Sequence, residues 1–203
     1  AQGEMYLTTV IELLRGAQHR VAAEIAVDTA STFGINDRVQ LAEAGRVLND
    51  RIVRRWQREG VTVVDPATTW IDDDAVLAPD VTILPNTHIL RATTIAEGAI
   101  IGPDTTLVDC EVGEAAIVRR TDATLAVIGA EATVGPFSFL RPGTILGAKG
   151  KIGAYVETKN AEIGEGSKVP HLSYVGDATI GRGVNLGAST ITANYDDVNK
   201  HRT

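Results

Sequence analysis

Residues 77–107, LAPDVTILPNTHILRATTIAEGAIIGPDTTL, carry an aliphatic residue at every sixth position. These positions are Leu77, Ile83, Ile89, Ile95, Ile101 and Leu107. The same step returns at Ile128, Val134, Leu140, Leu146 and Ile152, then from Ile163 to Val169 and from Ile180 to Leu186. An α-helix repeats its apolar positions every three or four residues, so this period excludes a helix here.

A period of six fits a short strand, a tight turn and another short strand, with one aliphatic side chain per hexad pointing inward. Three hexads close a triangular coil, and coils stack at the strand-pairing distance of about 4.8 Å. Glycine often follows the aliphatic residue, as in Ile101-Gly102, and tolerates the turn. Small residues are expected at the corners, at Ala99, Thr105, Ala132, Ser138 and Thr144. The sequence therefore predicts a mainly β fold, a left-handed parallel β-helix of hexapeptide repeats, with about six coils between Leu77 and Ile191.

Three interruptions break the step. Val118 and Ile128 are ten residues apart, which predicts an outward bulge from Arg119 to Thr124, because solenoids place insertions on their outside. Two other steps are of eleven residues, from Ile152 to Ile163 and from Val169 to Ile180, so each pair of hexads is one residue short. We expect the chemistry in these irregular coils.

Two different segments precede the hexads. Residues up to Arg15 have the spacing of a helix, and residues 21–27 have that of a strand, as at the C-terminal end of an α/β domain. A long helix is expected next, with apolar residues at Leu41, Ala44, Leu48, Ile52 and Trp56, an Asp37-x-x-Gln40 capping box and a stop at Gly60. Its arginines are interpreted as a solvated face. The predicted division is 1–38 for the α/β remnant, 39–59 for the linker helix and 60–203 for the β-helix.

The composition limits the class of protein. The net charge of −7 and pI of about 5.1 disfavour a protein that coats nucleic acid or an anionic membrane. No signal segment or membrane-spanning run is visible, and the single cysteine, Cys110, forms no internal disulfide, so a cytoplasmic protein is expected. Cys110 is interpreted as a small buried residue. Because no methionine start or glycine-rich phosphate loop precedes the first helix, we expect a fragment of a longer chain.

The stretch 169–177 departs from the repeat and contains His171, whose imidazole is a suitable general base. An isolated histidine is more often structural, but polar residues follow on later coils, at Tyr174, Asn185, Asn194 and Tyr195. Arg141, Lys159 and Lys200 are either solvated charges or a clamp for phosphate or carboxylate. A zinc site is disfavoured because the four histidines are scattered, and no base is apparent for Cys110.

Several motifs resemble one family over essentially the whole chain. They are QGEMYLT at 2–8, GINDRVQL at 34–41, VGPFSFLRPG at 134–143, HLSYVGD at 171–177 and ITANYD at 191–196. Together they resemble the bifunctional bacterial enzymes that combine N-acetylglucosamine-1-phosphate uridylyltransferase and glucosamine-1-phosphate N-acetyltransferase activities. The resemblance implies a Rossmann-like nucleotidyltransferase domain, a connecting helix and a homotrimeric β-helix that acetylates the sugar amine with acetyl-CoA. The product in the full-length enzyme would be UDP-N-acetylglucosamine, made with UTP for cell-wall precursor synthesis.

The resemblance also implies roles for individual residues. His171 would be the general base, and glucosamine 1-phosphate would be bound by Arg141, Lys159, Tyr174, Asn185 and Lys200. Acetyl-CoA would contact Ala188, Asn194 and Tyr195, with the Ala188 amide as a candidate oxyanion donor. Asn36 would help to hold Mg²⁺ and the UDP-sugar in the intact first domain. Asp197 stands where the family motif has glycine, which bears on the conformation of the loop leading to Lys200.

Two rival functions stay open on the sequence. The first is a non-catalytic β-helical scaffold for trimerisation and partner binding, which has no need for the cations or for a histidine in an irregular stretch. The second is another hexapeptide acyltransferase, which would share the fold and differ in its acceptor pocket.

Overall fold

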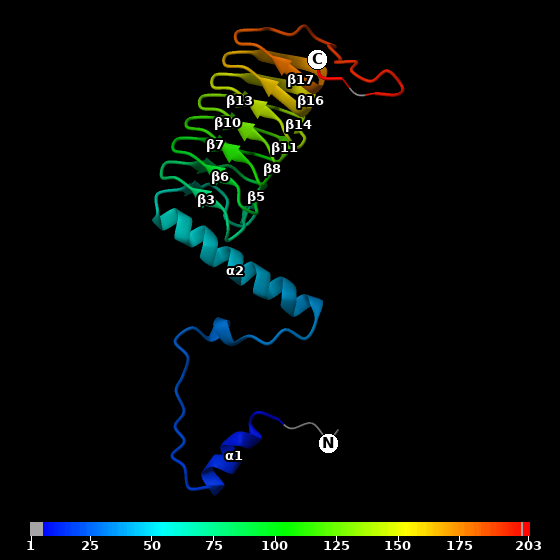
Figure 1. Cartoon of the computed structure of the whole chain (residues 1–203). Helices are drawn as coiled ribbons and strands as arrows, with labels where there is room; N and C mark the ends of the chain where they lie inside the picture. The colour runs from blue at the N-terminus through cyan, green and yellow to red at the C-terminus, as the bar shows by residue number, and fades with distance from the viewer. Residues whose placement is uncertain (1–5, 200) are drawn as a thin grey trace. The chain divides into compact units, whose positions relative to one another are not determined.

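The computed structural model describes residues 6–199 and 201–203 (Figure 1). The chain divides into two compact units, Ala1–Ala44 and Gly45–Thr203. The first unit contains the helix α1, Thr9–Gly16, the short 3₁₀ helix η1, Thr29–Thr32, and the start of the helix α2, Arg38–Arg58. Among the residues that the structure describes, no helix has the length and apolarity needed to cross a membrane.

The predicted strand at residues 21–27 is wrong. These residues follow α1 without regular structure, and Ile25 keeps 88% of its surface exposed. A strand is stabilised by hydrogen bonds to a neighbour, and no strand lies within residues 6–44 of the described chain. An alternation of apolar side chains alone cannot supply that partner.

The helix α2 forms as expected, but its cap and its buried face both differ from the prediction. Asp37 Oδ1 accepts the Gln40 N–H at 2.8 Å, whereas Gln40 Oε1 accepts the N–H of Asn36, at 2.7 Å, so only half of the capping box forms. The helix buries Asn49, Ile52, Val53 and Trp56. Of the predicted apolar positions, Leu41 and Leu48 are exposed.

Asn49 explains the shifted face. Its Nδ2 donates to the carbonyl of Thr69 at 2.8 Å, and its Oδ1 accepts the N–H of Ile71 at 3.1 Å. Ile71 belongs to the strand β2 at the first turn of the solenoid, so the side chain satisfies backbone groups at the end where the coils begin. The helix therefore covers the first coil as well as connecting to it.

The rest of the second unit is a parallel β-solenoid of about seven turns, which confirms the predicted fold class (Figure 1). Strand pairing starts at β1, ahead of Leu77, and every pairing is parallel. The strands are β1 Thr62–Val63, β2 Trp70–Ile71, β3 Val76–Leu77, β4 Thr82–Ile83, β5 Thr87–Leu90, β6 Thr94–Ile95, β7 Ile100–Ile101, β8 Thr105–Val108, β9 Glu111–Val112, β10 Ile117–Val118, β11 Thr121–Thr124, β12 Val127–Ile128, β13 Thr133–Val134, β14 Ser138–Leu140, β15 Ile145–Leu146, β16 Lys151–Ile163 and β17 Lys168–Ile180.

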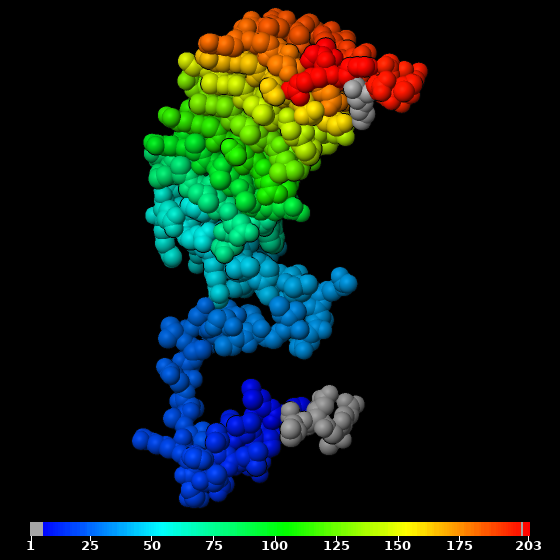
Figure 2. Space-filling model, in the orientation of Figure 1, coloured from blue at the N-terminus to red at the C-terminus, as the bar shows by residue number. Residues whose placement is uncertain are grey.

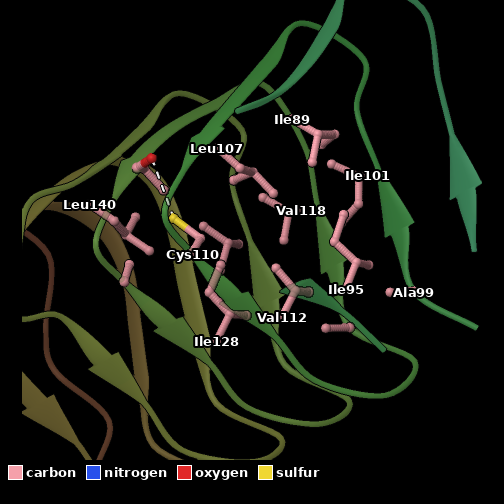
Figure 3. Packing of buried hydrophobic residues seen from close by; sticks show 14 of the residues in the cluster. Ile89, Ile95, Ala99, Ile101, Leu107, Cys110, Val112, Val118, Ile128 and Leu140 are labelled. Carbon is pink, nitrogen blue, oxygen red and sulfur yellow. Dashed lines mark hydrogen bonds between the residues drawn. The ribbon is translucent and has the colours of Figure 1, made fainter. Parts of the chain in front are cut away.

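The core of the solenoid is the column of aliphatic side chains that the hexads predict (Figure 3). From Leu77 to Val169 the predicted inward residues are buried, while Ile180 and Leu186 near the last turn are only partly buried. The small residues Ala99, Thr105, Ala132, Ser138 and Thr144 are buried as expected, but each lies directly after a corner residue and not at the corner itself. Cys110 is also buried, which raises the pKa of its thiol and fits a structural role.

The bulge predicted between Val118 and Ile128 is wrong. Residues Thr121–Thr124 form β11, which pairs with β8 below and β14 above, and Ala123 takes the inward position. The step of ten is therefore two steps of five, each one residue shorter than a hexad. The prediction failed because it counted only large aliphatic side chains as inward residues, and Ala123 is small. The two steps of eleven do split as predicted, with Thr158 and Val175 buried between the aliphatic positions.

The corners of the coil form three columns of residues with positive φ, one residue per turn in each. The first column is Asn86, Asp104, Arg120, Phe137, Tyr155, Leu172 and Ser189. The second is Arg91, Asp109, Leu125, Gly143, Asn160 and Asp177, and the third is Asp80, Gly98, Ala115, Glu131, Lys149, Gly166 and Gly183. Three corners per turn give the triangular cross-section. Most of these residues are not glycine, so each turn accepts the steric penalty of the left-handed region.

Candidate active site

The last two full coils carry a groove of about 400 Å³ on one face of the solenoid. β14, β16 and β17 supply most of its walls, and its lining residues are Phe137, Phe139, Tyr155, Val156, Glu157, Leu172, Ser173, Tyr174 and Ile191. The register stacks Phe139 on Glu157, Glu157 on Tyr174, and Tyr174 on Ile191. Residues 17 or 18 apart in the sequence are thus neighbours in this groove.

Arg141 lies at the edge of this groove and pairs with a carboxylate. Its Nη1 is 2.9 Å from Oε1 of Glu157, and both side chains are about 40% exposed. Because Glu157 stacks beside Tyr174, the guanidinium and the phenol approach the same patch of surface. A half-exposed ion pair of this kind contributes little to stability, so the arginine is available for another anion.

Lys159 lies in the neighbouring position and is more enclosed. Its Nζ is 4.0 Å from Oδ2 of Asp177, with the two side chains 31% and 20% exposed. Asp177 also accepts a hydrogen bond from Asn160 Nδ2 at 2.8 Å. The strand register places Lys159 beside Gly176.

Gly176 is the point around which these residues gather. A Cβ there would collide with the ring and hydroxyl of Tyr174, so the phenol lies directly over the glycine backbone. Asn194 reaches the same residue, because its Nδ2 donates to the Gly176 carbonyl at 2.8 Å. The structure therefore brings together four predicted site residues: Arg141, Lys159, Tyr174 and Asn194.

His171 lies on β17, across a corner from this group. The corner residue is Leu172, with φ of 44°, and Tyr174 follows two residues later. The His171 side chain is exposed, and its imidazole has no hydrogen-bond partner among the described residues. Its backbone carbonyl accepts the Ser173 hydroxyl at 2.6 Å, which fixes the main chain at the turn.

Asn185 and Ala188 lie on the coil that follows His171. Asn185 bridges Lys168, and Ile191 bridges Tyr174 in the same register, so Ala188 stacks over His171 between the two bridges. The backbone N–H of Ala188 donates no hydrogen bond within the described part of the chain. An exposed, unpaired N–H beside a histidine is suited to stabilise an oxyanion.

The remaining predicted residues are less tightly connected to the groove. Tyr195 is exposed, and its hydroxyl donates to the carbonyl of Asp197 at 2.9 Å. Asp197 adopts a φ of 72°, the conformation that the glycine of the family motif would favour. Lys200 lies outside the described residues.

Asn36, the predicted Mg²⁺ residue, belongs to the first unit and is exposed. Its Nδ2 is 3.3 Å from Oε1 of Gln40. Across residues 6–199 and 201–203 there is no group of three or more histidine, cysteine, aspartate or glutamate side chains that could hold a metal ion. The described residues do not fit Mg²⁺, which needs several oxygen ligands in octahedral geometry.

The sequence prediction missed two features of the site. One is Glu157, the carboxylate that pairs with Arg141. The other is the apolar corner, where the rings of Phe137 and Tyr155 stack with centroids 5.4 Å apart. Both follow from the length of a coil, because residues one turn apart are neighbours once that length is known.

The chain has clear relatives among curated proteins. It is 66% identical over 203 residues to the bifunctional protein GlmU of Clavibacter sepedonicus, with 100% of this chain and 41% of that protein covered. The bifunctional protein GlmU of Micrococcus luteus is 55% identical over 202 residues, again with 100% and 41% covered. The chain spans about 41% of the length of these relatives. No protein-family model matches it.

The matches among solved structures are more distant. The acetyltransferase domain of PglB from Neisseria gonorrhoeae is 16% identical with a TM-score of 0.35, covering 70% of this chain and 60% of that one. A mutant of perosamine N-acetyltransferase from Caulobacter crescentus, in complex with CoA and GDP-perosamine, is 20% identical with a TM-score of 0.21, covering 91% and 85%.

Proposed function

We propose that this chain transfers an acetyl group from acetyl-CoA to the amine of glucosamine 1-phosphate. All of this chain aligns with about 41% of the bifunctional protein GlmU. The observation that carries the proposal is the placement of Lys159, Tyr174 and Asn194 at Gly176, with Arg141 paired to Glu157 beside Tyr174 and the exposed His171 on the same strand as Tyr174. A scaffold would have no need for two cations and a free imidazole at one end of the solenoid.

In this proposal His171 is the general base. The sugar amine is mostly protonated at neutral pH, and only its lone pair can attack a thioester. The unpartnered imidazole takes the proton from the nitrogen, the nitrogen forms a bond to the acetyl carbon, and the carbon–sulfur bond breaks. The imidazolium returns this proton to the departing sulfur, so coenzyme A leaves as the thiol, and the second proton of the ammonium goes to water. The Ala188 N–H, stacked over His171, stabilises the oxyanion of the tetrahedral intermediate.

The cations in this proposal bind the phosphate. Arg141 and Lys159 each face a carboxylate in the free protein, Glu157 and Asp177 respectively. A phosphate carries more charge than either carboxylate and offers a bidentate acceptor to the guanidinium. Tyr174 and Asn185 complete the sugar site, together with Lys200, and Asn194 and Tyr195 contact acetyl-CoA.

We also propose that the protein is a homotrimer. The groove itself exposes the aromatic rings of Phe137, Phe139 and Tyr155 together with Leu172 and Ile191. An apolar cluster of this kind is typical of an interface between chains. Ile100 and Ile145 add further exposed aliphatic side chains along the solenoid.

For the whole protein the resemblance further implies uridylyl transfer from UTP to give UDP-N-acetylglucosamine in the cytoplasm. That reaction would belong to a first domain that ends near residue 38, joined by the linker helix 39–59 to the acetyltransferase domain 60–203. Asn36 is the one residue of this chain that the resemblance assigns to the Mg²⁺ site. The described residues do not fit the ion, because they hold no group of side chains that could supply its several oxygen ligands.

Release of the coenzyme A thiol on addition of glucosamine 1-phosphate tests the acetylation. His171→Ala should reduce the rate about 10²- to 10⁴-fold, the usual effect of removing a general base, without changing the melting temperature. His88→Ala is the matched control, because His88 is an exposed histidine on the strand β5 of the same solenoid. Activity of His171→Ala near that of the unsubstituted chain would remove this residue from the mechanism. A chain that releases no thiol would favour the scaffold, and thiol release with a different amine alone would favour another acyltransferase.

A further inference from the structure

The segment 194–203, here called the C-terminal loop and described at all but residue 200, projects from the side of the last coils (Figures 1 and 2). It is anchored at both ends. Asn194 donates to the Gly176 carbonyl, and the N–H of Thr203 donates to the Asp177 carbonyl at 2.9 Å. The Arg202 guanidinium is 2.8 Å from Glu162 and also donates to the Thr179 hydroxyl at 2.9 Å.

Between these anchors, a single carboxylate closes the loop. Oδ1 of Asp196 accepts the backbone N–H groups of Val198 and Asn199 at 3.0 and 2.6 Å. Oδ2 of Asp196 lies 2.8 Å from Nε2 of His201. One side chain therefore joins the two arms of the loop and holds three donor groups.

Among the described residues of the loop, three other hydrogen bonds act inside it: the Asp196 N–H donates to the Asn199 carbonyl at 3.2 Å, and the His201 N–H and the Tyr195 hydroxyl each donate to a loop carbonyl. No residue from 195 to 199 is buried, and Val198 is 82% exposed. Asp197 occupies the left-handed region, which is unfavourable for a residue with a Cβ. With no buried residue from 195 to 199, the loop depends on hydrogen bonds for its shape, and the Asp196 carboxylate takes part in three of them.

The loop geometry is coupled to two of the proposed acetyl-CoA contacts. The N–H of His201 donates to the carbonyl of Asn194 at 2.7 Å. The Tyr195 hydroxyl donates to the carbonyl of Asp197, the residue that follows the carboxylate. A change in the Asp196–His201 contact would therefore move Asn194 and Tyr195 relative to the groove.

We propose that Asp196 and His201 are positioning residues that latch the C-terminal loop and so hold Asn194 and Tyr195 in place for acetyl-CoA. The inference rests on the proposed function, because it assumes that acetyl-CoA is the molecule bound there. It adds a pair of residues that touch neither substrate and act through the loop. Loss of the latch should weaken acetyl-CoA binding more than it slows the chemical step, because the loop carries no group that exchanges a proton in the reaction.

The test compares His201→Ala with His201→Gln in the whole chain. The glutamine amide can donate to the Asp196 carboxylate in place of the imidazole, whereas alanine cannot. Arg182→Ala is the control, because Arg182 forms an exposed ion pair with Glu165 at 2.9 Å outside the loop. Two quantities are measured: hydrogen exchange at the amides of Val198 and Asn199, and the affinity for acetyl-CoA by titration calorimetry.

For His201→Ala we expect faster exchange at both amides and acetyl-CoA binding that is about two- to fivefold weaker, as for the loss of an exposed ion pair. His201→Gln should restore both values, and Arg182→Ala should change neither. Unchanged exchange in His201→Ala would show that no latch exists. Faster exchange with unchanged affinity would show that the latch does not position the site. If the unsubstituted chain binds no acetyl-CoA while its amides are protected, the proposed function fails and the latch itself stands.

Discussion

At the scale of single residues, the proposed site is a set of cations already paired with carboxylates. Arg141 and Glu157 are neighbours on adjacent coils, with 2.9 Å between Nη1 and Oε1. Such a pair keeps the guanidinium oriented when the phosphate is absent. Because of this pair, a phosphate must displace Glu157 from Arg141. The carboxylate therefore lowers the affinity of the site for the sugar phosphate.

We predict that Arg141→Ala raises the KM for glucosamine 1-phosphate about 10- to 100-fold, since a charge-assisted hydrogen bond is lost, and leaves the KM for acetyl-CoA nearly unchanged. The single variant also leaves Glu157 unpaired and repelling the phosphate. Arg141→Ala combined with Glu157→Gln should therefore recover part of the loss. Steady-state kinetics with each substrate varied in turn measures both effects. An equal rise in the two KM values would mean that Arg141 supports the structure and does not bind the phosphate.

The carboxylate of Asp196 gives a prediction about pH. Its hydrogen bond from the Asn199 N–H, followed by those from His201 and the Val198 N–H, lowers the pKa of Asp196 from 3.8 to about 2. Because the folded pKa is depressed, the carboxylate stabilises the loop fully above pH 3.8, and this contribution is lost as the pH falls through about 2. The amide resonances of Val198 and Asn199 should titrate with a midpoint near that pKa of about 2. A midpoint near the ordinary value of 3.8 would contradict the hydrogen bonds, and Asp196→Asn should abolish the transition.

The sequence singles out some of these residues and not others for a physical reason. His171 lies in a stretch that departs from the repeat, so the departure marks it. Glu157 lies in an unremarkable polar position, and its role comes from stacking between Phe139 and Tyr174. A partner one coil away becomes visible only when the length of each coil is known, and that length varies between 16 and 18 residues along the corner from Asn86 to Ser189.

At the scale of elements, the helix α2 is more than a connector. Asn49 is buried, and its amide bonds both the Thr69 carbonyl and the Ile71 N–H, which lie 20 and 22 residues away. The first coil of a solenoid has no coil beneath it, so these backbone groups have no strand to pair with. One amide side chain supplies both a donor and an acceptor, which a hydrophobic residue at the same position cannot do.

We predict that Asn49→Leu destabilises the chain by about 1–3 kcal/mol, because two buried backbone groups lose their partners while the volume of the side chain is roughly kept. Denaturant unfolding measures the change in free energy. Asp50→Leu is the control, since Asp50 is the exposed neighbour on the same turn of helix. If Asn49→Leu is as stable as the unsubstituted chain, Asn49 does not secure the first coil.

The elements also show where a pattern of apolar residues is enough to predict a strand and its buried positions. Inside the solenoid, the six-residue step identifies buried positions because each coil buries its neighbour. At residues 21–27 a similar alternation gives no strand, since no partner strand lies within the described residues of the first unit. At Ala123 the pattern misses a strand that is present, because the inward residue is too small to be counted among the large aliphatic residues.

At the scale of the whole molecule, the fold follows from one repeated step and the site follows from how the coils stack. The sequence alone predicts the parallel β-solenoid and most of its inward residues. It does not predict that His171 lies across the Leu172 corner from Arg141, Lys159 and Tyr174, because the corner is set by backbone φ and not by residue type. If His171 and the cations act on one substrate molecule, that molecule must therefore contact the solenoid on both sides of the Leu172 corner.

A crystal structure with glucosamine 1-phosphate bound tests this arrangement most directly. We expect the phosphate within hydrogen-bond distance, about 2.7–3.2 Å, of Arg141 and Lys159, with Glu157 displaced from its 2.9 Å contact. The amine of the sugar should face a His171 imidazole, in the space where the thioester carbon would lie. Two results would contradict the assignment of this site to acetyl transfer. One is glucosamine 1-phosphate bound away from the groove, and the other is the sugar bound in the groove with its amine far from the His171 imidazole of each chain in the proposed trimer.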